Sequence, residues 1–282
     1  MLYLLFNPLA NNKRGEQDAQ EWAKKQGLEP TFKSVIGLNF CEFFSKLKKD
    51  DEVILTGGDG TLNWLVNDIE KCKINNPLYY VKCGSGNDFY RDVEHLEKDG
   101  KVDLKPFIRN LPFIEVAGLK RRFINGIGYG VDGDTCLVGD QIRKENPDAV
   151  INYSKIAVKL LLTSYQTKNC KVIVDGEEHE FKNVWVAATM NGRFYGGGIN
   201  AAPKQDRLNN NGTVTLTVLS SKGRLRSLLR FPTFSSGKHD KKKYITSFVG
   251  KKITVIYDAP CALQIDGEVV PDVTTYTVQF GD

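Results

Sequence analysis

Hydrophobic residues in the first 115 positions alternate between short continuous runs and longer stretches with helical spacing. The runs predict strands at Leu2–Phe6, Thr31–Ile36, Glu52–Leu55 and Leu78–Val81. The intervening stretches have polar faces and predict helices at Gly15–Gln26, Asn39–Lys48 and Thr61–Ile69. This alternation specifies a mostly parallel sheet with helices on both faces, so residues 1–115 are predicted to form an α/β domain.

After residue 113 the pattern changes to short β-rich segments separated by glycine and asparagine. They predict strands at Phe113–Val116, Lys171–Val174, Val184–Met190, Gly212–Leu219, Ile253–Tyr257 and Thr275–Phe280. Helical patterns interrupt them at Tyr153–Thr163 and Leu225–Leu229. We therefore predict that residues 116–282 form an antiparallel β-sandwich, with a cleft between the two domains and a last strand that could return toward the first domain.

The composition is that of a folded globular protein, with 282 residues of which 41% are hydrophobic and 26% charged. No apolar run approaches the roughly 20 residues that cross a bilayer, and the apolar start of the chain is too short for a signal peptide. We therefore expect a cytoplasmic protein. The six cysteines form no Cys-x-x-Cys pair, so neither zinc nor a structural disulfide is expected.

Three predicted strands of the first domain end in polar loops, at Asn7–Asn12, Thr56–Thr61 and Cys83–Asp88. The carboxyl ends of parallel strands meet at one sheet edge, where α/β proteins bind ligands. Glycines let the backbone approach a phosphate, and a helix that begins there turns its amide groups toward the anion. A tight turn also needs glycines, but three such loops at one edge favour phosphate binding. The chain has no P-loop of the usual NTPase type.

The segment Gly128–Gly133 fits the dinucleotide pattern Gly-x-Gly-x-x-Gly. That pattern identifies a dinucleotide site only where it opens a helix inside a βαβ unit, and the surroundings here are β-rich. We therefore interpret Asn125–Asp134 as a glycine-rich strand and turn that lines the cleft, with Asp132 exposed to it.

Many of these segments occur in the same order in one known family. They are Asn7-Pro8, Gly57–Asn67, Gly84–Phe89, Phe123–Gly128, Asn152–Ser154, Met190–Gly192, Gly196–Gly198, Gly237–His239 and Ile265–Glu268. Over nearly the whole chain, the sequence resembles the diacylglycerol kinase catalytic-domain family, which includes bacterial lipid kinases and sphingosine kinases. The resemblance implies a Rossmann-like first domain, a β-sandwich that binds the lipid, and transfer of the ATP γ-phosphate to a lipid hydroxyl.

The resemblance also implies roles for residues at matching positions. Those that would contact the nucleotide are Asn7, Pro8, Leu9, Ala10, Asn11, Ser34, Gly58, Asp59, Gly60, Thr61, Leu62, Asn63, Trp64 and Ser85. Ser34 stands where the family has a threonine. An acidic network of Asp59, Asp88 and Asp132 would surround a catalytic Mg²⁺, so the expected cofactors are ATP and Mg²⁺.

The turn Asp266-Gly267-Glu268 brings carboxylates from the β-rich domain. Phosphoryl transfer needs a carboxylate that takes the proton of the acceptor hydroxyl. The resemblance implies that Glu268 is this group, with Asp266 beside it and Asp59 as the third catalytic residue. An Asp-Gly pair is also a common hairpin turn, and we interpret Asp175-Gly176-Glu177 as such a turn alone.

The loop after Ala202-Pro203 departs from the family pattern, in which aspartates before a glycine hold a structural Mg²⁺. Here the loop ends in three asparagines, at 209 to 211, before Gly212-Thr213. An asparagine oxygen is a weaker ligand for a hard cation than a carboxylate. Two alternatives stay open. Either a structural metal binds Asn211 and the backbone oxygen of Thr213, with Asp206 as a substitute ligand, or the chain has no such site.

Charge divides unevenly, with 16 basic and 18 acidic residues in positions 1–115 against 23 and 16 in positions 116–282. In residues 222–243, lysines and arginines interleave with Leu225, Leu228, Leu229 and Phe231. This segment is either a basic amphipathic flap on an anionic membrane or a core-facing helix with a solvated rim. Nucleic acid is not an expected partner, because no helix-turn-helix or aromatic platform accompanies the charge.

Together these features predict an ATP- and Mg²⁺-dependent lipid kinase at the inner membrane face, with a lipid substrate, a peripheral membrane contact and a possible homodimer. Two alternatives stay open. Gly-Gly-Asp-Gly-Thr is shared with NAD kinases, which act on a soluble substrate, and the asparagines at 209 to 211 suggest a non-catalytic nucleotide-binding membrane adaptor. The identity of the lipid acceptor is beyond the sequence.

Overall fold

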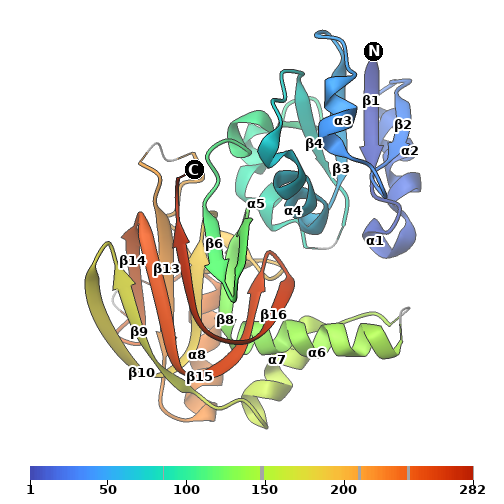
Figure 1. The fold of residues 1–282 in the computed structure, drawn as a ribbon. Coiled ribbons are helices and arrows are strands. Elements are labelled where there is room, and N and C mark those ends of the chain that lie inside the picture. The colour runs from blue at the N-terminus through green and yellow to red at the C-terminus, as the bar shows by residue number, and fades with distance from the viewer. Residues whose placement is uncertain (85, 147–148, 209–210, 240–241, 282) are drawn as a thin grey trace. The chain divides into compact units, whose positions relative to one another are not determined.

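A computed structural model describes residues 1–84, 86–146, 149–208, 211–239 and 242–281 (Figure 1). The chain divides into two compact units, Met1–Arg109 and Asn110–Asp282. The division lies a few residues before the predicted boundary at residue 115. The predicted architecture of an α/β unit followed by an antiparallel β unit is confirmed.

The first unit is built on a sheet with the strand order β2-β1-β3-β4-β5. Its strands are β1 (Leu2–Phe6), β2 (Thr31–Ser34), β3 (Glu52–Gly57), β4 (Leu78–Lys82) and β5 (Val102–Asp103). The first four are parallel, and β5 runs antiparallel to β4. Val53, Ile54 and Leu55 are fully buried, because the central strand β3 has both faces covered.

Short helices connect these strands. They are α1 (Ala10–Lys13), α2 (Gly15–Lys25), α3 (Phe40–Ser45), α4 (Asp59–Asp68), η1 (Ile69–Lys71), α5 (Asp88–Val93), η2 (Glu94–Leu96) and η3 (Lys105–Phe107). Ala19 and Ala23 of α2 pack against Leu4 and Ile54, since small side chains let the helix approach the sheet closely. The three helices predicted in this unit correspond to α2, α3 and α4.

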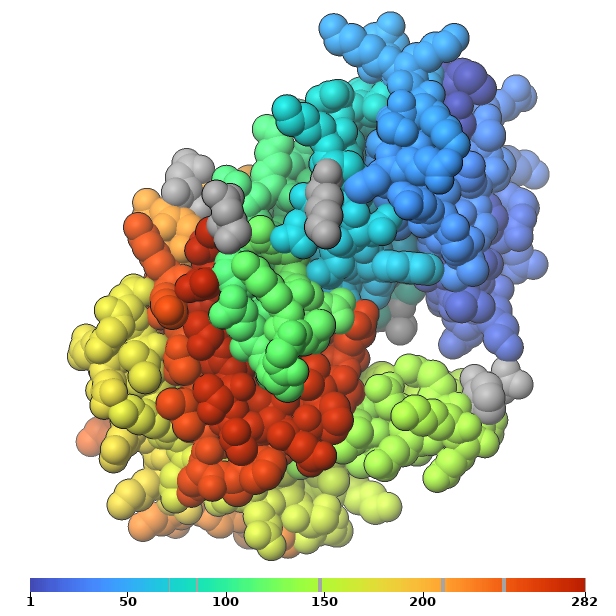
Figure 2. Space-filling view, in the orientation of Figure 1, coloured from blue at the N-terminus to red at the C-terminus, as the bar shows by residue number. Residues whose placement is uncertain are grey.

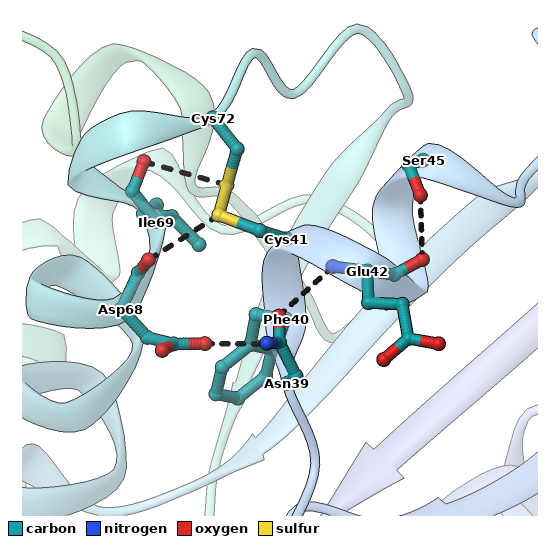
Figure 3. The surroundings of a disulfide bond; sticks show 8 residues. All are labelled: Asn39, Phe40, Cys41, Glu42, Ser45, Asp68, Ile69 and Cys72. Carbon is teal, nitrogen blue, oxygen red and sulfur yellow. Dashed lines mark hydrogen bonds between the residues drawn. A yellow bond between two sulfur atoms is a disulfide. The ribbon is translucent and has the colours of Figure 1, made fainter.

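A disulfide joins Cys41 in α3 to Cys72, the residue after η1 (Figure 3). The same junction is tied by the amide of Phe40, which donates to Asp68 Oδ2 at 2.8 Å. The expectation that the chain has no structural disulfide is therefore wrong. The two cysteines are 31 residues apart, and only the packing of α3 beside α4 brings them together.

The second unit contains a 9-stranded antiparallel sheet in the described part of the chain. Its strands are β6 (Phe113–Val116), β7 (Leu119–Arg122), β8 (Gly126–Gly130), β9 (Lys168–Val174), β10 (Glu177–Met190), β13 (Val214–Ser220), β14 (Ile245–Gly250), β15 (Lys252–Ile265) and β16 (Glu268–Gln279). A separate hairpin pairs β11 (Phe194–Tyr195) with β12 (Ile199–Asn200). The last strand, β16, pairs with β15 and β6 within this unit.

Two long strands, β10 and β15, make the sheet curl on itself. The first half of each pairs with β9 and the second half with β8. The change of partner coincides with shifts of register, between Val184 and Val186 in β10 and between Ile256 and Cys261 in β15. The enclosed core includes Tyr129 and Tyr257, whose rings stack with centroids 4.0 Å apart.

Helices α6 (Val131–Glu145), α7 (Tyr153–Leu162) and α8 (Arg224–Ser235) complete this unit. Leu161 of α7 and Phe234 of α8 join Trp185 of β10 in a second core cluster. In Figure 2 the yellow-green surface of α6 and α7 stands out beyond the red and orange surface of the strands. No helix in the described ranges is both long enough and apolar enough to span a bilayer.

Helix α6 corrects the interpretation of Asn125–Asp134 as a strand and turn. The strand ends at Gly130, and the helix begins at the next residue. Glycines weaken the helical signal of this segment, but Gly133 is required by packing, because a Cβ atom there would lie 2.0 Å from the carbonyl oxygen of Ala262. Strand β8 is flanked by antiparallel strands, so the segment is not part of a βαβ unit.

The disulfide makes a prediction for the stability of the first unit. The disulfide closes a loop that contains β3, the glycine-rich turn and α4, with its two cysteines 31 residues apart. For a loop of this length, removal of the disulfide should lower the free energy of unfolding by about 3 to 4 kcal/mol. Replacing Cys41 and Cys72 by serine should therefore lower the midpoint of denaturant unfolding of this unit. Cys136→Ser, at a free cysteine, is the control. Equal midpoints for the parent and the Cys41/Cys72 variant would contradict the prediction.

Candidate active site

The carboxyl ends of β1, β3 and β4 lie side by side, because these strands are neighbours and parallel. Asn7, directly after β1, donates its Nδ2 to Thr61 Oγ1 of α4 at 3.0 Å. The hydroxyl of Tyr80 and the amide of Cys83 both donate to the carbonyl oxygen of Gly57, at 2.7 and 2.8 Å. The tips predicted from the sequence to converge are thus linked by hydrogen bonds.

Helix α4 begins at this sheet edge, and glycines around its start leave the backbone there without side chains. A Cβ atom on Gly57 would lie 2.5 Å from Thr61 Oγ1, so only glycine allows the chain to turn this tightly. A Cβ atom on Gly60 would meet no atom within 4 Å, which leaves that backbone accessible. No side chain caps the helix at Gly58. Its first amides and the positive end of its dipole can therefore serve an anion.

Asp59 joins the ends of β3 and β4. Its Oδ2 accepts the amide of Asp88 and its Oδ1 accepts the amide of Phe89, each at 2.9 Å. These are the first amides of α5, so Asp59 caps a helix that follows a different strand from its own. Asp88 is itself buried. Two of the three acids of the predicted magnesium network therefore lie together at one strand edge, and their role as ligands stays a prediction.

The other residues predicted to bind nucleotide differ in their accessibility. Leu9 and Trp64 are exposed, whereas Leu62 and Asn63 are fully buried and their side chains face the core of the unit. Ser34 lies beside Phe6 in the β1–β2 register, and its Oγ accepts the amide of Ile36 at 3.1 Å. Pro8, Ala10 and Asn11 share the loop and helix start after β1. Ser85 lies outside the described residues.

Sequence reasoning missed Asp18, which holds two of the loops in place from helix α2. Its Oδ2 accepts the Nδ2 of Asn11 at 2.7 Å and the thiol of Cys83 at 3.2 Å. Burial, together with this hydrogen bond to Asp18, raises the pKa of Cys83 to about 12. In the sequence Asp18 is an ordinary acid in the first turn of a helix, and no pattern connects it to positions 11 and 83.

In the second unit, Asp266 anchors the turn between β15 and β16. Its carboxylate accepts the amides of Ile124, Asn125 and Gly126, at 2.6, 2.9 and 2.9 Å. These residues lead into β8, so the turn is clamped to the start of a buried strand. Asp266 and Gly267 both have left-handed backbone angles, with φ of 46° and 94°, as a two-residue hairpin turn requires.

The turn at Asp175-Gly176 has nearly the same backbone, with φ of 50° and 95°. The predicted turn is confirmed, and Asp175 also accepts backbone amides, from Lys251 and Lys252. The two motifs differ at the glutamate. Both glutamates are exposed, but Glu268 forms an ion pair with Arg121 of β7, whose side chain is largely buried, whereas Glu177 Oε1 lies 3.6 Å from His179 Nε2. Tertiary contacts, and not the tripeptide, distinguish Glu268.

A second arginine supports the same end of β8. Arg207 donates to the carbonyl oxygen of Ile124 and, at 2.6 Å, to Asn125 Oδ1, while Asn191 Nδ2 donates to Ile124 O at 3.1 Å. Asn125 and Asn191 are both buried. Arg121 and Arg207 were not predicted, because an arginine whose partners lie far away in the sequence leaves no local pattern.

Asp132 lies in the first turn of α6 and accepts a hydrogen bond from the hydroxyl of Tyr195. It is partly buried, because Tyr195 of β11 contacts it. Its exposure to a cleft between the domains stays a prediction. Burial raises the pKa of Asp132 to about 6, and the hydrogen bond from Tyr195 offsets part of that effect. At neutral pH the carboxylate is therefore ionised, and keeping this charge partly buried costs free energy because the group has lost hydrating water.

The loop suggested for a structural metal is braced by an amide side chain. Gln205 is buried, and its Nε2 donates to the carbonyl oxygen of Thr213 at 3.0 Å. Its Oε1 accepts the hydroxyl of Thr215 at 2.6 Å. Asn209 and Asn210 lie outside the described residues, and Asn211 is exposed. This amide occupies one lone pair of the Thr213 oxygen and braces the loop without a metal, and the structural Mg²⁺ stays a prediction.

The described residues contain no group of three or more His, Cys, Asp or Glu side chains placed to hold a metal ion. The pair Asp59 and Asp88 still suits Mg²⁺ at a triphosphate, because that ion is commonly held by one or two carboxylates together with phosphate oxygens. The donor chemistry of the first unit therefore fits a nucleotide-bound Mg²⁺.

Comparison with known proteins gives the same division of the chain. Residues 1–111 match the family described as the diacylglycerol kinase catalytic domain, and residues 125–279 match the YegS C-terminal NAD kinase beta sandwich-like domain. The Bacillus subtilis protein named "Putative lipid kinase YtlR" is 25% identical over 246 residues, which cover 80% of this chain and 75% of that protein. A Mycobacterium tuberculosis diacylglycerol kinase is 26% identical over 240 residues, which cover 79% and 75%.

The fold agrees with a crystal structure from Bacillus anthracis titled as a diacylglycerol kinase. The match has a TM-score of 0.65 at 19% identity and covers 99% of this chain and 93% of that one. An α/β unit with phosphate-suited strand tips, followed by a curled antiparallel sheet, defines a two-domain kinase fold. The chain belongs to the diacylglycerol kinase catalytic-domain family, as its sequence predicted.

The raised pKa of Asp132 predicts a pH-dependent stability. The folded state binds the proton more tightly than the unfolded state, whose Asp has a pKa near 3.8. The contribution of Asp132 to stability is therefore greatest below pH about 4 and is lost as the pH rises through about 6. Asp132→Asn should remove this loss, which amounts to about 2 to 3 kcal/mol. Denaturant unfolding of the nucleotide-free protein at several pH values measures it. Parallel stability curves for parent and variant would contradict the assignment.

The brace at Gln205 predicts a metal-independent second unit. Addition of EDTA should leave the thermal midpoint of this unit unchanged. Gln205→Ala should lower its stability by about 1 to 3 kcal/mol, because two buried partners lose their hydrogen bonds. Calorimetry with and without EDTA and Mg²⁺ tests both statements, with the exposed Lys204→Ala as the control. A large Mg²⁺-dependent rise in the midpoint of the parent would overturn this account.

Proposed function

We propose that this protein is a lipid kinase that transfers the γ-phosphate of ATP to a hydroxyl of a diacylglycerol-like lipid at a membrane surface. The observation that carries the proposal is the edge formed by the ends of β1, β3 and β4. There a helix begins uncapped on a bare backbone, beside two carboxylates, in a chain whose family is that of diacylglycerol kinases. This edge has the properties that a triphosphate with Mg²⁺ requires.

In this proposal the phosphates lie along the turn from Gly57 to Gly60, against the amino terminus of α4. Backbone amides and the helix dipole then stabilise the negative charge that shifts between phosphate oxygens during transfer. Asn7 holds the Thr61 side chain, and Asp59 holds the start of α5, so both neighbouring loops are fixed before the nucleotide arrives. Preorganised groups of this kind need no rearrangement during the reaction.

Asp59 and Asp88 would hold a Mg²⁺ that also binds the triphosphate. When bound, such an ion neutralises charge on the β- and γ-phosphates and orients them for an in-line attack. Asp59 Oδ1 and Oδ2 each accept one backbone amide of α5. The backbone of α5 thereby fixes the orientation of the carboxylate.

Glu268 is proposed as the group that takes the proton of the acceptor hydroxyl. The hydroxyl oxygen then forms a bond to the γ-phosphorus, the bond from that phosphorus to the bridging oxygen breaks, and ADP leaves with the electron pair. The Arg121 ion pair fixes the Glu268 side chain, and Asp266 fixes the turn that carries it. Asp266 therefore acts as a positioning residue whose carboxylate is already bound by three amides.

Activity of designed variants tests this assignment. The protein with Mg²⁺-ATP should phosphorylate diacylglycerol in mixed micelles, and Glu268→Gln should lower kcat by at least about a hundredfold, as expected for loss of a general base. Asp59→Asn should abolish turnover through loss of the magnesium ligand. Glu177→Gln, at the equivalent position of the twin turn, is the matched control and should retain full activity.

Two outcomes would contradict the proposal. Full activity of both Glu268→Gln and Asp59→Asn would show that the site lies elsewhere. Phosphorylation of NAD with no turnover of any lipid would favour a kinase of a soluble substrate. Asp59→Asn also loses an acceptor for one amide of α5, so its folding is checked by thermal unfolding before its activity is interpreted.

A further inference from the structure

Two exposed helix faces in the second unit carry the same pattern of side chains. In α7 and around α8 the pattern begins with a basic residue. The third residue after it is apolar, the fourth is basic and the seventh is apolar. The first face consists of Lys155, Val158, Lys159 and Leu162, and the second of Lys222, Leu225, Arg226 and Leu229. This spacing places the residues within each helix on one side of it. Lys222 lies just before Gly223, the residue that precedes α8, and all eight side chains are exposed.

The apolar members of these faces are not needed for the core. Leu161, Ser227 and Phe234 are the buried residues of α7 and α8, and the last belongs to the cluster that contains Trp185. By contrast, Val158 and Leu162 are 43% and 49% exposed, and Leu225 and Leu229 are 68% and 73% exposed. Each helix therefore packs by one side and presents a second apolar stripe to its surroundings.

Arg224 joins the two stripes into one surface. Its guanidinium group donates to the carbonyl oxygens of Thr163 and Leu162, at 2.5 and 3.3 Å. This contact ties the start of α8 to the end of α7, and the two helices pack against each other. Leu162 is the last residue of α7 and Leu225 the second of α8, so both lie at these adjoining ends. We call the eight side chains of the two faces, thus joined, the α7–α8 face.

The charge of this face identifies its partner. Residues 149–174 and 207–239 contain no aspartate or glutamate, so the lysines and arginines of the face meet no acid from their own segments. Arg230 points inward instead, with one hydrogen bond to Ser221 and its guanidinium over the Tyr244 ring. Exposed leucines between basic side chains, on segments without acids, match an anionic bilayer, where apolar side chains enter the interface and cations meet lipid phosphates.

We propose that the α7–α8 face docks this protein on anionic membranes, which deepens the proposed function by naming the surface that reaches the lipid. For residues 222–243 the sequence left open a membrane-binding flap or a core-facing helix. In this proposal each description applies to one side of α8. Leu228 and Phe231 pack against the core, while Leu225 and Leu229 face the membrane.

Sedimentation with vesicles tests the surface directly. The full chain should bind vesicles that contain about one third phosphatidylglycerol more tightly than vesicles of phosphatidylcholine alone, and added salt should weaken the binding. Replacing Leu225 and Leu229 by glutamine should weaken binding to the anionic vesicles roughly tenfold or more. Replacing Lys155 and Lys159 by glutamine should have a similar effect. Val249→Gln, at a valine of β14 that is 64% exposed, is the matched control.

Several results would overturn the inference. One is unchanged vesicle binding by the Leu225/Leu229 variant, and another is equal binding of the parent to neutral and anionic vesicles. A dimer in solution that the same variant dissociates, without vesicle binding by the parent, would assign the face to contact between copies of this chain.

A kinase assay separates failure of the inference from failure of the proposed function. The Leu225/Leu229 variant should phosphorylate a short-chain, water-soluble diacylglycerol at the parent rate and lose activity on vesicles that contain a long-chain acceptor. If no form of the protein phosphorylates any lipid but the vesicle results hold, the proposed function fails and the docking surface stands. If the variant keeps full activity on vesicles and full binding, the surface fails and the kinase assignment stands.

Discussion

The acceptance of backbone amides by aspartate side chains is the interaction on which both units depend. Asp59 binds the first amides of α5, and Asp266 binds three successive amides that lead into β8. Hydrogen bonds to an ionised acceptor are stronger than neutral ones. Each aspartate therefore fixes a loop that would otherwise have no regular structure to hold it.

The acids of the two units fall into two kinds. Some accept backbone amides and hold the fold, and others can take part in the reaction. Asp266 has its oxygens engaged by backbone amides, whereas Glu268, two residues later, is exposed and forms an ion pair with Arg121. Asp59 accepts two backbone amides and is also one of the acids that we propose for the magnesium ion. The same logic explains the twin turn at Asp175, which has the clamp but places its glutamate beside a histidine and not beside a buried arginine.

Two other loops are held by bonds of a different kind, one covalent and one a hydrogen bond. A disulfide closes the loop that contains the glycine-rich turn, and a glutamine side chain joins the ends of the loop after Pro203. A neutral amide provides at Thr213 a connection that a cation would provide in a loop rich in carboxylates. Partner changes in β10 and β15 curl the sheet without any cross-link, because the register shifts bend both strands.

The sequence by itself determined the architecture, the family and the convergence of the strand tips, because hydrophobic periodicity and the order of glycine-rich motifs are local properties of the chain. Strand β1 and the motif at Gly57–Thr61 are where the pattern placed them. Helix α6 was missed, since Gly133 weakens its helical signal for the sake of a contact with Ala262, far away in the sequence. The partners Asp18, Arg121, Arg207 and Gln205, the pairing of Cys41 with Cys72, and the burial of Asp132 were decided by the tertiary structure alone. Each depends on two segments that meet only after folding, and no local spacing encodes such a meeting.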